Sequence, residues 1–216
     1  FEQNIRFNGN GCITLTSKQP YWTDKEGYTT PVTLEFDGTT IKLNGIAIKN
    51  NDIDLSSVEI TEEEIQKFEQ IYIVACGSAW HVGMAAQYVI EDLVDVPVRV
   101  DLASEFRYRK MPINKNSLVI VISQSGETAD SLAALREAKQ RGIRTLGIVN
   151  VVGSSIAREA DNVFYTLAGP EISVATTKAY STQLIASYVL AVQFGKVREQ
   201  ITEEKYQELI AELKTL

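Results

Sequence analysis

Five short and almost wholly apolar runs, separated by longer helical stretches, constrain the fold of the chain beyond residue 70. Such runs lack the strict alternation of apolar and polar residues seen in a strand with one solvent-exposed face. They are typical of strands that are buried on both faces. Strands of this kind that alternate with helices form a parallel sheet with helices on both sides. We therefore predict an α/β fold with a five-stranded, doubly wound parallel sheet in the flavodoxin-like order 2-1-3-4-5. The predicted strands are Ile71–Ala75, Val98–Asp101, Leu118–Ile122, Arg144–Val149 and Asn162–Thr166.

The helices expected around these strands have recognisable start signals. Thr61 and Glu64 have the spacing of a capping box, in which each side chain accepts a hydrogen bond from the backbone N–H of the other residue. The short helix that they begin is expected to end near Glu69. Further helices are expected at 80–93, at 128–141, just after Ser155, at 176–194 and from Thr202 to the end.

Residues 1–50 follow a different pattern from the rest of the chain. They are rich in Asn, Gly and Thr, and Cys12–Thr16 and Val32–Phe36 alternate as strands do. The turn signals Asp37-Gly38 and Asn44-Gly45 flank a further β-prone run at Thr39–Leu43. We expect a small antiparallel hairpin or meander with a packing or linking role. The predicted organisation is a β-rich segment at 1–50, a linker with a short helix at 51–70 and an α/β domain at 71–216.

The composition argues against several classes of function. The 216 residues, 44% of them hydrophobic, suffice for one good core. The net charge of −7 argues against binding to nucleic acid or to an anionic membrane, and no apolar run approaches the roughly 20 residues of a membrane-spanning helix. Cys12, Cys76 and the single histidine, His81, form no zinc-ligand pattern, so we expect no metal, no cofactor and no disulfide, as in a reducing cytoplasm. No signal peptide is visible at the N-terminus and no starting Met is present, so we expect a fragment or a processed chain.

Two loops meet where a ligand is expected. In open α/β sheets, ligands bind beyond the carboxyl ends of the strands at the point where the strand order reverses, here between the first and third strands. The loops at this point, Cys76–Ala79 and Ser123–Thr128, are rich in small and hydroxyl-bearing residues, and each leads into a helix. A helix N-terminus offers free N–H groups and partial positive charge, and Gly126 allows the backbone to approach a ligand closely. The loops therefore predict a cradle for one phosphate and a few sugar hydroxyls.

Simpler interpretations of these residues stay open at the level of the sequence. A Ser or Thr at a helix start is most often an N-cap, although the grouping of several at one switch point favours a binding site. The segment Gly77–Gly83 does not match the dinucleotide-binding pattern Gly-x-Gly-x-x-Gly, and no Walker A sequence is present. A third loop at 168–178 could close over the same site, and Lys178 within it is expected to be solvated.

At these loops the sequence resembles a known family. The Ser-Gln-Ser-Gly-Glu-Thr stretch that begins at Ser123 is typical of SIS (sugar isomerase) domains in general. Five blocks together, in order and spacing, closely resemble the first SIS domain of the glucosamine-6-phosphate synthase (glutamine–fructose-6-phosphate aminotransferase) family, from about residue 54 to residue 194. These blocks are Ala75–Ser78, Ala103–Arg109, Ser123–Asp130, Asn150–Ser155, and Gly169–Ile172 with Ala175–Ala179.

The resemblance implies a substrate and a set of binding residues. In that family a glutaminase domain releases ammonia from glutamine, and a pair of SIS domains isomerises and aminates fructose 6-phosphate. The family usually has Thr-Ser where this chain has Ser78-Ala79, so no sugar contact is expected from Ala79. The implied contacts are Ser123, Gln124, Ser125 and Thr128 for the phosphate, Ser78 and Val174 for the sugar, and beside them Cys76, Gly77, Ala175 and Thr176.

The resemblance also implies that this segment contains no catalytic residue. The family's glutaminase nucleophile is an N-terminal cysteine, and its isomerase acid–base residues lie in the second SIS domain and the tail, so the segment alone is expected to be inactive. Two alternatives stay open. A lone sugar-phosphate sensor would be expected to carry a DNA-binding motif, and a stand-alone ketose or aldose phosphate isomerase would have only His81 and Glu127 as acid–base candidates. The expected partners are fructose 6-phosphate or a related hexose phosphate, a second copy in a homodimer, and the second SIS and glutaminase domains of a parent chain.

Overall fold

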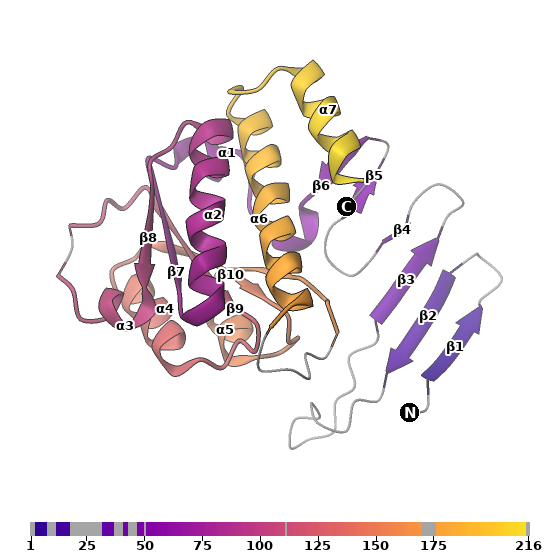
Figure 1. Ribbon diagram of the computed structural model, residues 1–216, viewed down its shortest axis with the longest axis horizontal. Coiled ribbons are helices and arrows are strands. Elements are labelled where there is room, and N and C mark those ends of the chain that lie inside the picture. The colour runs from indigo at the N-terminus through magenta and orange to yellow at the C-terminus, as the bar shows by residue number, and fades with distance from the viewer. Residues whose placement is uncertain are drawn as a thin grey trace. The chain divides into compact units, whose positions relative to one another are not determined.

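The chain forms two compact units, residues 1–57 and residues 58–216 (Figure 1). The computed structural model describes residues 51–110, 112–169 and 176–214, and before residue 51 it describes five strands. In the first unit an antiparallel sheet has its strands in chain order, and a separate hairpin follows it. The sheet consists of β1 (Gln3–Phe7), β2 (Cys12–Ser17), β3 (Val32–Phe36) and β4 (Ile41–Lys42), and the hairpin of β5 (Ala47–Lys49) and β6 (Asp52–Asp54).

The predicted meander in this unit is confirmed at β2, at β3 and at β4, which lies within the expected run Thr39–Leu43, whereas β1, β5 and β6 were not expected. The two turn signals, Asp37-Gly38 and Asn44-Gly45, lie outside the described residues.

The second unit is built on a five-stranded sheet in which all strands are parallel. The strand order is β8-β7-β9-β10-β11, which is the predicted order 2-1-3-4-5. The central strand β9 is buried along its whole length, and this double-sided burial explains its unbroken apolar sequence. The strands are β7 (Gln70–Ala75), β8 (Val98–Leu102), β9 (Ser117–Ser123), β10 (Arg144–Val149) and β11 (Asn162–Tyr165).

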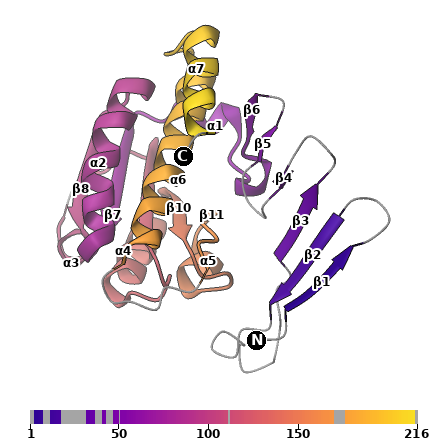
Figure 2. The same cartoon turned by 45° about the vertical axis from the view of Figure 1, so that its right-hand side comes forward.

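Helices cover both faces of this sheet (Figures 1 and 2). Long helices α2 and α6 lie side by side on one face, where α1 and α7 pack against α6. Helices α3, α4 and α5 cover the other face. The helices are α1 (Glu62–Lys67), α2 (Gly77–Val94), α3 (Ala103–Phe106), α4 (Ala129–Gln140), α5 (Ser155–Glu159), α6 (Lys178–Val197) and α7 (Glu203–Leu213), with a 3₁₀ turn at Ser56–Val58.

Two details of the helices differ from the sequence-based expectation. Helix α2 begins at Gly77 rather than at Trp80, directly after β7, so its first turn lies at the switch point of the sheet. Helix α3 was not predicted, because its four residues are too few to show a helical period. The capping box at Thr61 is confirmed: the Thr61 hydroxyl accepts from Glu64 N at 3.2 Å, and Thr61 N donates to the Glu64 carboxylate at 2.9 Å.

Helices α2 and α6 pack closely because Gly195 lies at their contact. A Cβ at position 195 would lie 2.4 Å from the carbonyl oxygen of Leu93 in α2, so only glycine allows this approach. Just beyond, the Arg198 guanidinium donates to the carbonyl of Val94 at 3.1 Å, and to three carbonyls at the end of α1 at 3.0 Å each. One side chain at the end of α6 therefore joins the ends of α1 and α2.

No helix within residues 51–110, 112–169 and 176–214 combines the length and the apolar character that crossing a membrane would require.

Candidate functional site

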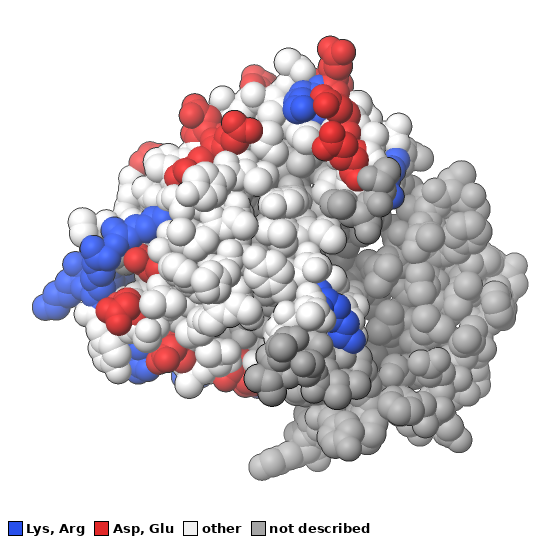
Figure 3. Space-filling model, viewed as in Figure 1, with Lys and Arg blue, Asp and Glu red and all other residues white. Residues whose placement is uncertain are grey.

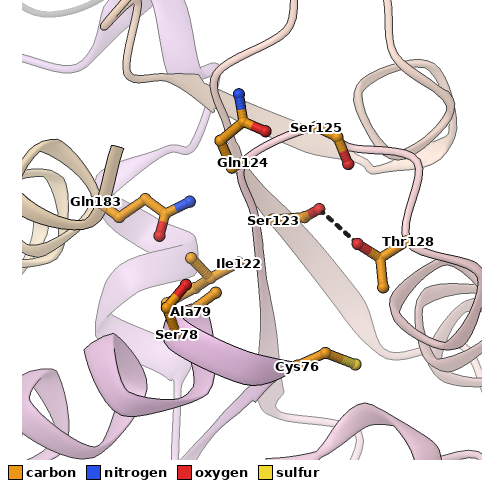
Figure 4. Close-up of a pocket in the computed structure, with 9 residues that line it drawn as sticks. All are labelled: Cys76, Ser78, Ala79, Ile122, Ser123, Gln124, Ser125, Thr128 and Gln183. Atoms are coloured by element: carbon orange, nitrogen blue, oxygen red, sulfur yellow. Dashed lines mark hydrogen bonds between the residues drawn. The ribbon is translucent and has the colours of Figure 1, made fainter. Parts of the chain in front are cut away.

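The carboxyl ends of β7 and β9 border a small pocket, with a cavity of about 180 Å³ (Figure 4). Strand β7 leads directly into α2, and β9 leads through a loop into α4, so both helices begin beside the cavity. A volume below the roughly 300–1,000 Å³ of pockets for drug-sized ligands suits a small polar molecule. The pocket is lined by Cys76, Ser78, Ala79, Ile122, Ser123, Gln124, Ser125, Thr128 and Gln183.

The hydroxyls of the β9–α4 loop are arranged to donate hydrogen bonds into this pocket. Ser123 Oγ accepts from the N–H of Gly126 at 3.1 Å and lies 3.2 Å from Thr128 Oγ1. Ser125 Oγ accepts from the N–H of Glu127 at 3.2 Å. Because these oxygens already accept from the backbone, their own protons are directed elsewhere, and the bond between Ser123 and Thr128 uses only one of two protons. The loop can therefore donate to an anion without any change in its own hydrogen bonds.

The structure argues against the simpler interpretation of these residues as helix caps. Thr128 occupies the N-cap position of α4, and Cys76 that of α2, yet neither side chain makes a capping hydrogen bond. By contrast, Thr61 and Thr202 do cap their helices with their hydroxyls. The Thr128 hydroxyl instead lies on the pocket wall beside Ser123 (Figure 4).

Gly126 gives the loop its shape. Its φ of +68° falls in the left-handed region, and a Cβ there would lie 2.0 Å from Ser154 Oγ. The Gly126 carbonyl accepts from Ile156 N at 3.0 Å, and the Glu127 carboxylate accepts from Ser155 N at 2.7 Å. The loop is thereby fixed to the start of α5, so its hydroxyls are held in place before any ligand arrives.

Asn150 joins the loops after β9, β10 and β11. Its N–H donates to the carbonyl of Gln124 at 3.2 Å, and its buried side chain donates to the carbonyl of Gly169 at 2.7 Å. Its side-chain oxygen accepts from Ala168 N at 2.6 Å and from the Thr166 hydroxyl at 3.2 Å. The third loop predicted to approach the site is thus tied at its start to the residue that follows β10.

Gln183 lines the pocket, and it was not predicted from the sequence. It lies on α6 and is 1% exposed, and its Nε2 has no hydrogen-bond partner within the described part of the chain. The sequence contained a signal that was missed: Gln183 falls on the same helical stripe as the buried residues Ala179, Ala186 and Leu190. A polar residue on such a stripe, in the helix after the third loop, is a candidate for contact with a ligand.

The sequence-predicted contacts divide into three groups. The pocket wall includes six of them, Cys76, Ser78, Ser123, Gln124, Ser125 and Thr128. Gly77 begins α2 next to this wall, and Thr176 lies before the start of α6 without lining the pocket. Val174 and Ala175 lie outside the described residues. The role of each as a ligand contact stays a prediction.

The charge and chemistry of the described wall suit binding better than catalysis. Its lining contains no Lys, Arg, Asp, Glu or His, and Cys76 is its one ionisable side chain. Cys76 Sγ lies 3.8 Å from the Ser131 hydroxyl. The two sequence-derived acid–base candidates are elsewhere: His81 is exposed with its ring 5.0 Å from that of Trp80, and Glu127 is bonded to Ser155 N. Among the described residues, no group of three His, Cys, Asp or Glu could hold a metal ion.

Comparison of the chain with known protein families gives a match that covers the pocket. A family model described as the SIS domain matches residues 64–193, which include every described residue of the pocket wall.

Named relatives cover the same part of the chain. A protein of Clostridium tetani named glutamine–fructose-6-phosphate aminotransferase [isomerizing] is 56% identical over 159 residues, which are 74% of this chain and 26% of that protein. The protein of the same name from Methanosarcina acetivorans is 46% identical over 160 residues, again 74% of this chain and 26% of the relative. The chain thus spans about a quarter of the length of these relatives.

A solved structure shares the fold of the second unit. It is the C-terminal domain of glucosamine-fructose-6-phosphate aminotransferase from Francisella tularensis, with a TM-score of 0.69 and 42% sequence identity. The match covers 71% of this chain and 43% of that one.

Proposed function

This chain belongs to the SIS domain family, and from that premise we propose that its pocket binds a hexose phosphate, fructose 6-phosphate or glucosamine 6-phosphate. The proposed binding domain is residues 71–216. One observation carries the proposal: the hydroxyls of Ser123, Ser125 and Thr128 line one pocket and are not used as helix caps. Such a wall of neutral donors at the start of a helix recognises a phosphate without needing a positively charged side chain.

We further propose that the domain belongs to the isomerase part of a glucosamine-6-phosphate synthase, which makes glucosamine 6-phosphate from fructose 6-phosphate and glutamine. The identity of 56% to a named aminotransferase supports this assignment. Proton transfer needs a positioned acid and base, and the described pocket wall has neither. The segment alone is therefore expected to bind the sugar phosphate and not to convert it, with the second SIS domain and the glutaminase domain of the parent chain supplying the chemistry.

The binding proposal is tested by calorimetric titration of Ser125→Ala with fructose 6-phosphate. A hydrogen bond to a charged acceptor contributes roughly 1.5–3 kcal/mol, so the affinity should fall by about tenfold or more, since about 1.4 kcal/mol is a factor of ten. Thr61→Ala is the matched control, because Thr61 caps α1 and is not part of the pocket wall. It should lower stability by about 1 kcal/mol and leave the affinity unchanged. Fructose without its phosphate should bind far more weakly to all three proteins.

The loop is structural, and the proposed site is wrong, if Ser125→Ala lowers the melting temperature as Thr61→Ala does but retains the wild-type affinity for fructose 6-phosphate.

We propose that the chain forms a homodimer. Its proposed location is the cytoplasm. On α6 and α7 the apolar positions Val189, Val192, Tyr206 and Ile210 are buried within the chain, which leaves Leu184, Ile185, Tyr188, Leu209 and Leu213 half-buried. Tyr88 on α2 is 71% exposed, and the surface over the middle of α2 and α6 has few charged residues (Figure 3). Light scattering should give twice the chain mass of 24.0 kDa, and a clean monomer at every concentration would refute the dimer.

A further inference from the structure

Gln183 is a buried polar side chain whose amide NH₂ group makes no hydrogen bond within the described part of the chain. The residue is 1% exposed. Buried amide groups in native proteins are nearly always hydrogen-bonded, because leaving one unpaired is unfavourable. The unpaired amide of Gln183 is explained most simply by a hydrogen-bond partner that arrives with the ligand.

The Gln183 amide faces the same cavity as the hydroxyl loop, from another wall. The residue comes from the second turn of α6, and Figure 4 shows its side chain directed into the pocket from the side opposite Thr128. Ala79 and Ile122 lie nearby and offer no side-chain hydrogen bond, whereas Ser78 beside Ala79 offers a hydroxyl. The cavity therefore has two sides, one with the hydroxyls of the β9–α4 loop and one with the amide of Gln183 and the hydroxyl of Ser78.

The two sides suit the two parts of a hexose phosphate. With the phosphate held by the hydroxyls of the β9–α4 loop, as proposed above, the sugar would extend across the cavity toward Gln183 on α6. A sugar hydroxyl both donates and accepts, and it can satisfy a neutral amide fully. We propose that Gln183 binds an oxygen of the sugar part of the ligand, and so selects a hexose phosphate over phosphate alone. This inference rests on the proposed function and deepens it by assigning a specificity-determining residue.

The test replaces Gln183 with methionine and measures affinity for two probes, fructose 6-phosphate and inorganic phosphate. Methionine keeps the length and flexibility of the side chain and removes the amide. The affinity for fructose 6-phosphate should fall about tenfold, and the affinity for inorganic phosphate should change less than twofold. The melting temperature should stay the same or rise, because the substitution removes an unpaired buried donor.

A matched control lies on the same helix. Gln193 accepts a hydrogen bond from the Tyr206 hydroxyl at 2.9 Å and is not part of the pocket wall. Gln193→Met removes the same groups from a glutamine that has a partner, so it should lower the melting temperature and leave both affinities unchanged.

A second measurement needs no variant that might fail to fold. In the wild-type protein, the side-chain NH₂ resonances of Gln183 should shift when fructose 6-phosphate is added and stay in place when inorganic phosphate is added.

The outcomes separate this inference from the proposed function. If the wild-type chain binds no hexose phosphate at all, both are overturned. If the wild type binds fructose 6-phosphate and Gln183→Met binds it equally well, with no shift of the amide resonances, only the role of Gln183 is overturned. Equal losses of affinity for both probes would place Gln183 at the phosphate and would also overturn it.

Discussion

At the scale of single residues, Gly126 is the position at which the loop has least freedom to change. Its backbone is left-handed, with φ at +68°, and the absent Cβ would overlap both the Oγ of Ser154, at 2.0 Å, and its Cβ, at 2.5 Å. Its N–H also holds Ser123 Oγ in place. The requirement for glycine thus has two independent causes, the backbone conformation and the neighbouring serine.

These two causes can be separated by Gly126→Ala and Ser154→Gly, alone and together. A left-handed residue other than glycine costs about 1–2 kcal/mol, so Gly126→Ala should lower the free energy of unfolding by more than that, since the clash is added. With Ser154→Gly present, the cost should return to about the left-handed penalty alone. Urea denaturation gives the coupling between the sites. Additive losses would mean that Ser154 does not restrict the loop.

At the scale of secondary-structure elements, Asp161 connects α4, β10 and the start of β11. Its carboxylate accepts from the backbone N–H of Thr145 at 3.0 Å and from the Thr145 hydroxyl at 2.7 Å, and it pairs with Lys139 at 2.8 Å. Burial alone would raise the pKa of Asp161, but the hydrogen bonds from Lys139 and Thr145 outweigh it and hold the pKa below its ordinary value.

Because of these contacts of Asp161, the free energy of unfolding should depend on pH. An unfolded Asp titrates near pH 4, and the folded pKa is lower, so as the pH falls the unfolded state takes up the proton first. The contribution is complete above about pH 4 and is lost as the pH falls through the folded pKa. Asp161→Asn should therefore lower the free energy of unfolding by about 1 kcal/mol at pH 7, and by less below pH 4.

Asp92→Asn is the control for this measurement, because it removes the charge of an exposed carboxylate. If Asp161→Asn lowers the free energy of unfolding by the same amount at every pH from 7 to 3, the titration of Asp161 does not contribute to stability.

Most of the elements could be predicted because the sheet is buried on both faces. A strand such as β9, buried from Ser117 to Ser123, shows an unbroken apolar run that no other arrangement explains as well. The α3 helix and the hairpin of β5 and β6 were missed, since elements of three or four residues are too short to show a period. The strand order was predicted as the flavodoxin-like order common among doubly wound sheets, and not from any single residue.

At the scale of the whole molecule, the site could be predicted where its residues lie in one loop or where the predicted strand order brings two loops together. The hydroxyls of 123–128 lie in one loop, and the switch point of the sheet brings Cys76 and Ser78 to the same place. Gln183 comes from a helix whose sequence predicts only a role in core packing. Its place in the pocket depends on which residues surround it in space. The sequence could not reveal that the cap positions of α2 and α4 lack side-chain caps, because capping depends on the rotamer of each side chain.

The guanidinium of Arg198 ties together segments that are more than a hundred residues apart in the chain, and this has a consequence for slow motions. Helix ends normally fray independently, and their amide protons therefore exchange with solvent at unrelated rates. Here the last turns of α1 and α2 are bonded to one guanidinium, through its Nη1 and its Nε, so they should open together as a cooperative unit. Arg198→Met should raise the exchange rates of the Phe68 and Asp95 amides in parallel, by roughly tenfold or more for a loss of about 1.5–3 kcal/mol. Exchange that quickens only at the end of α6 would mean that the three helix ends open independently.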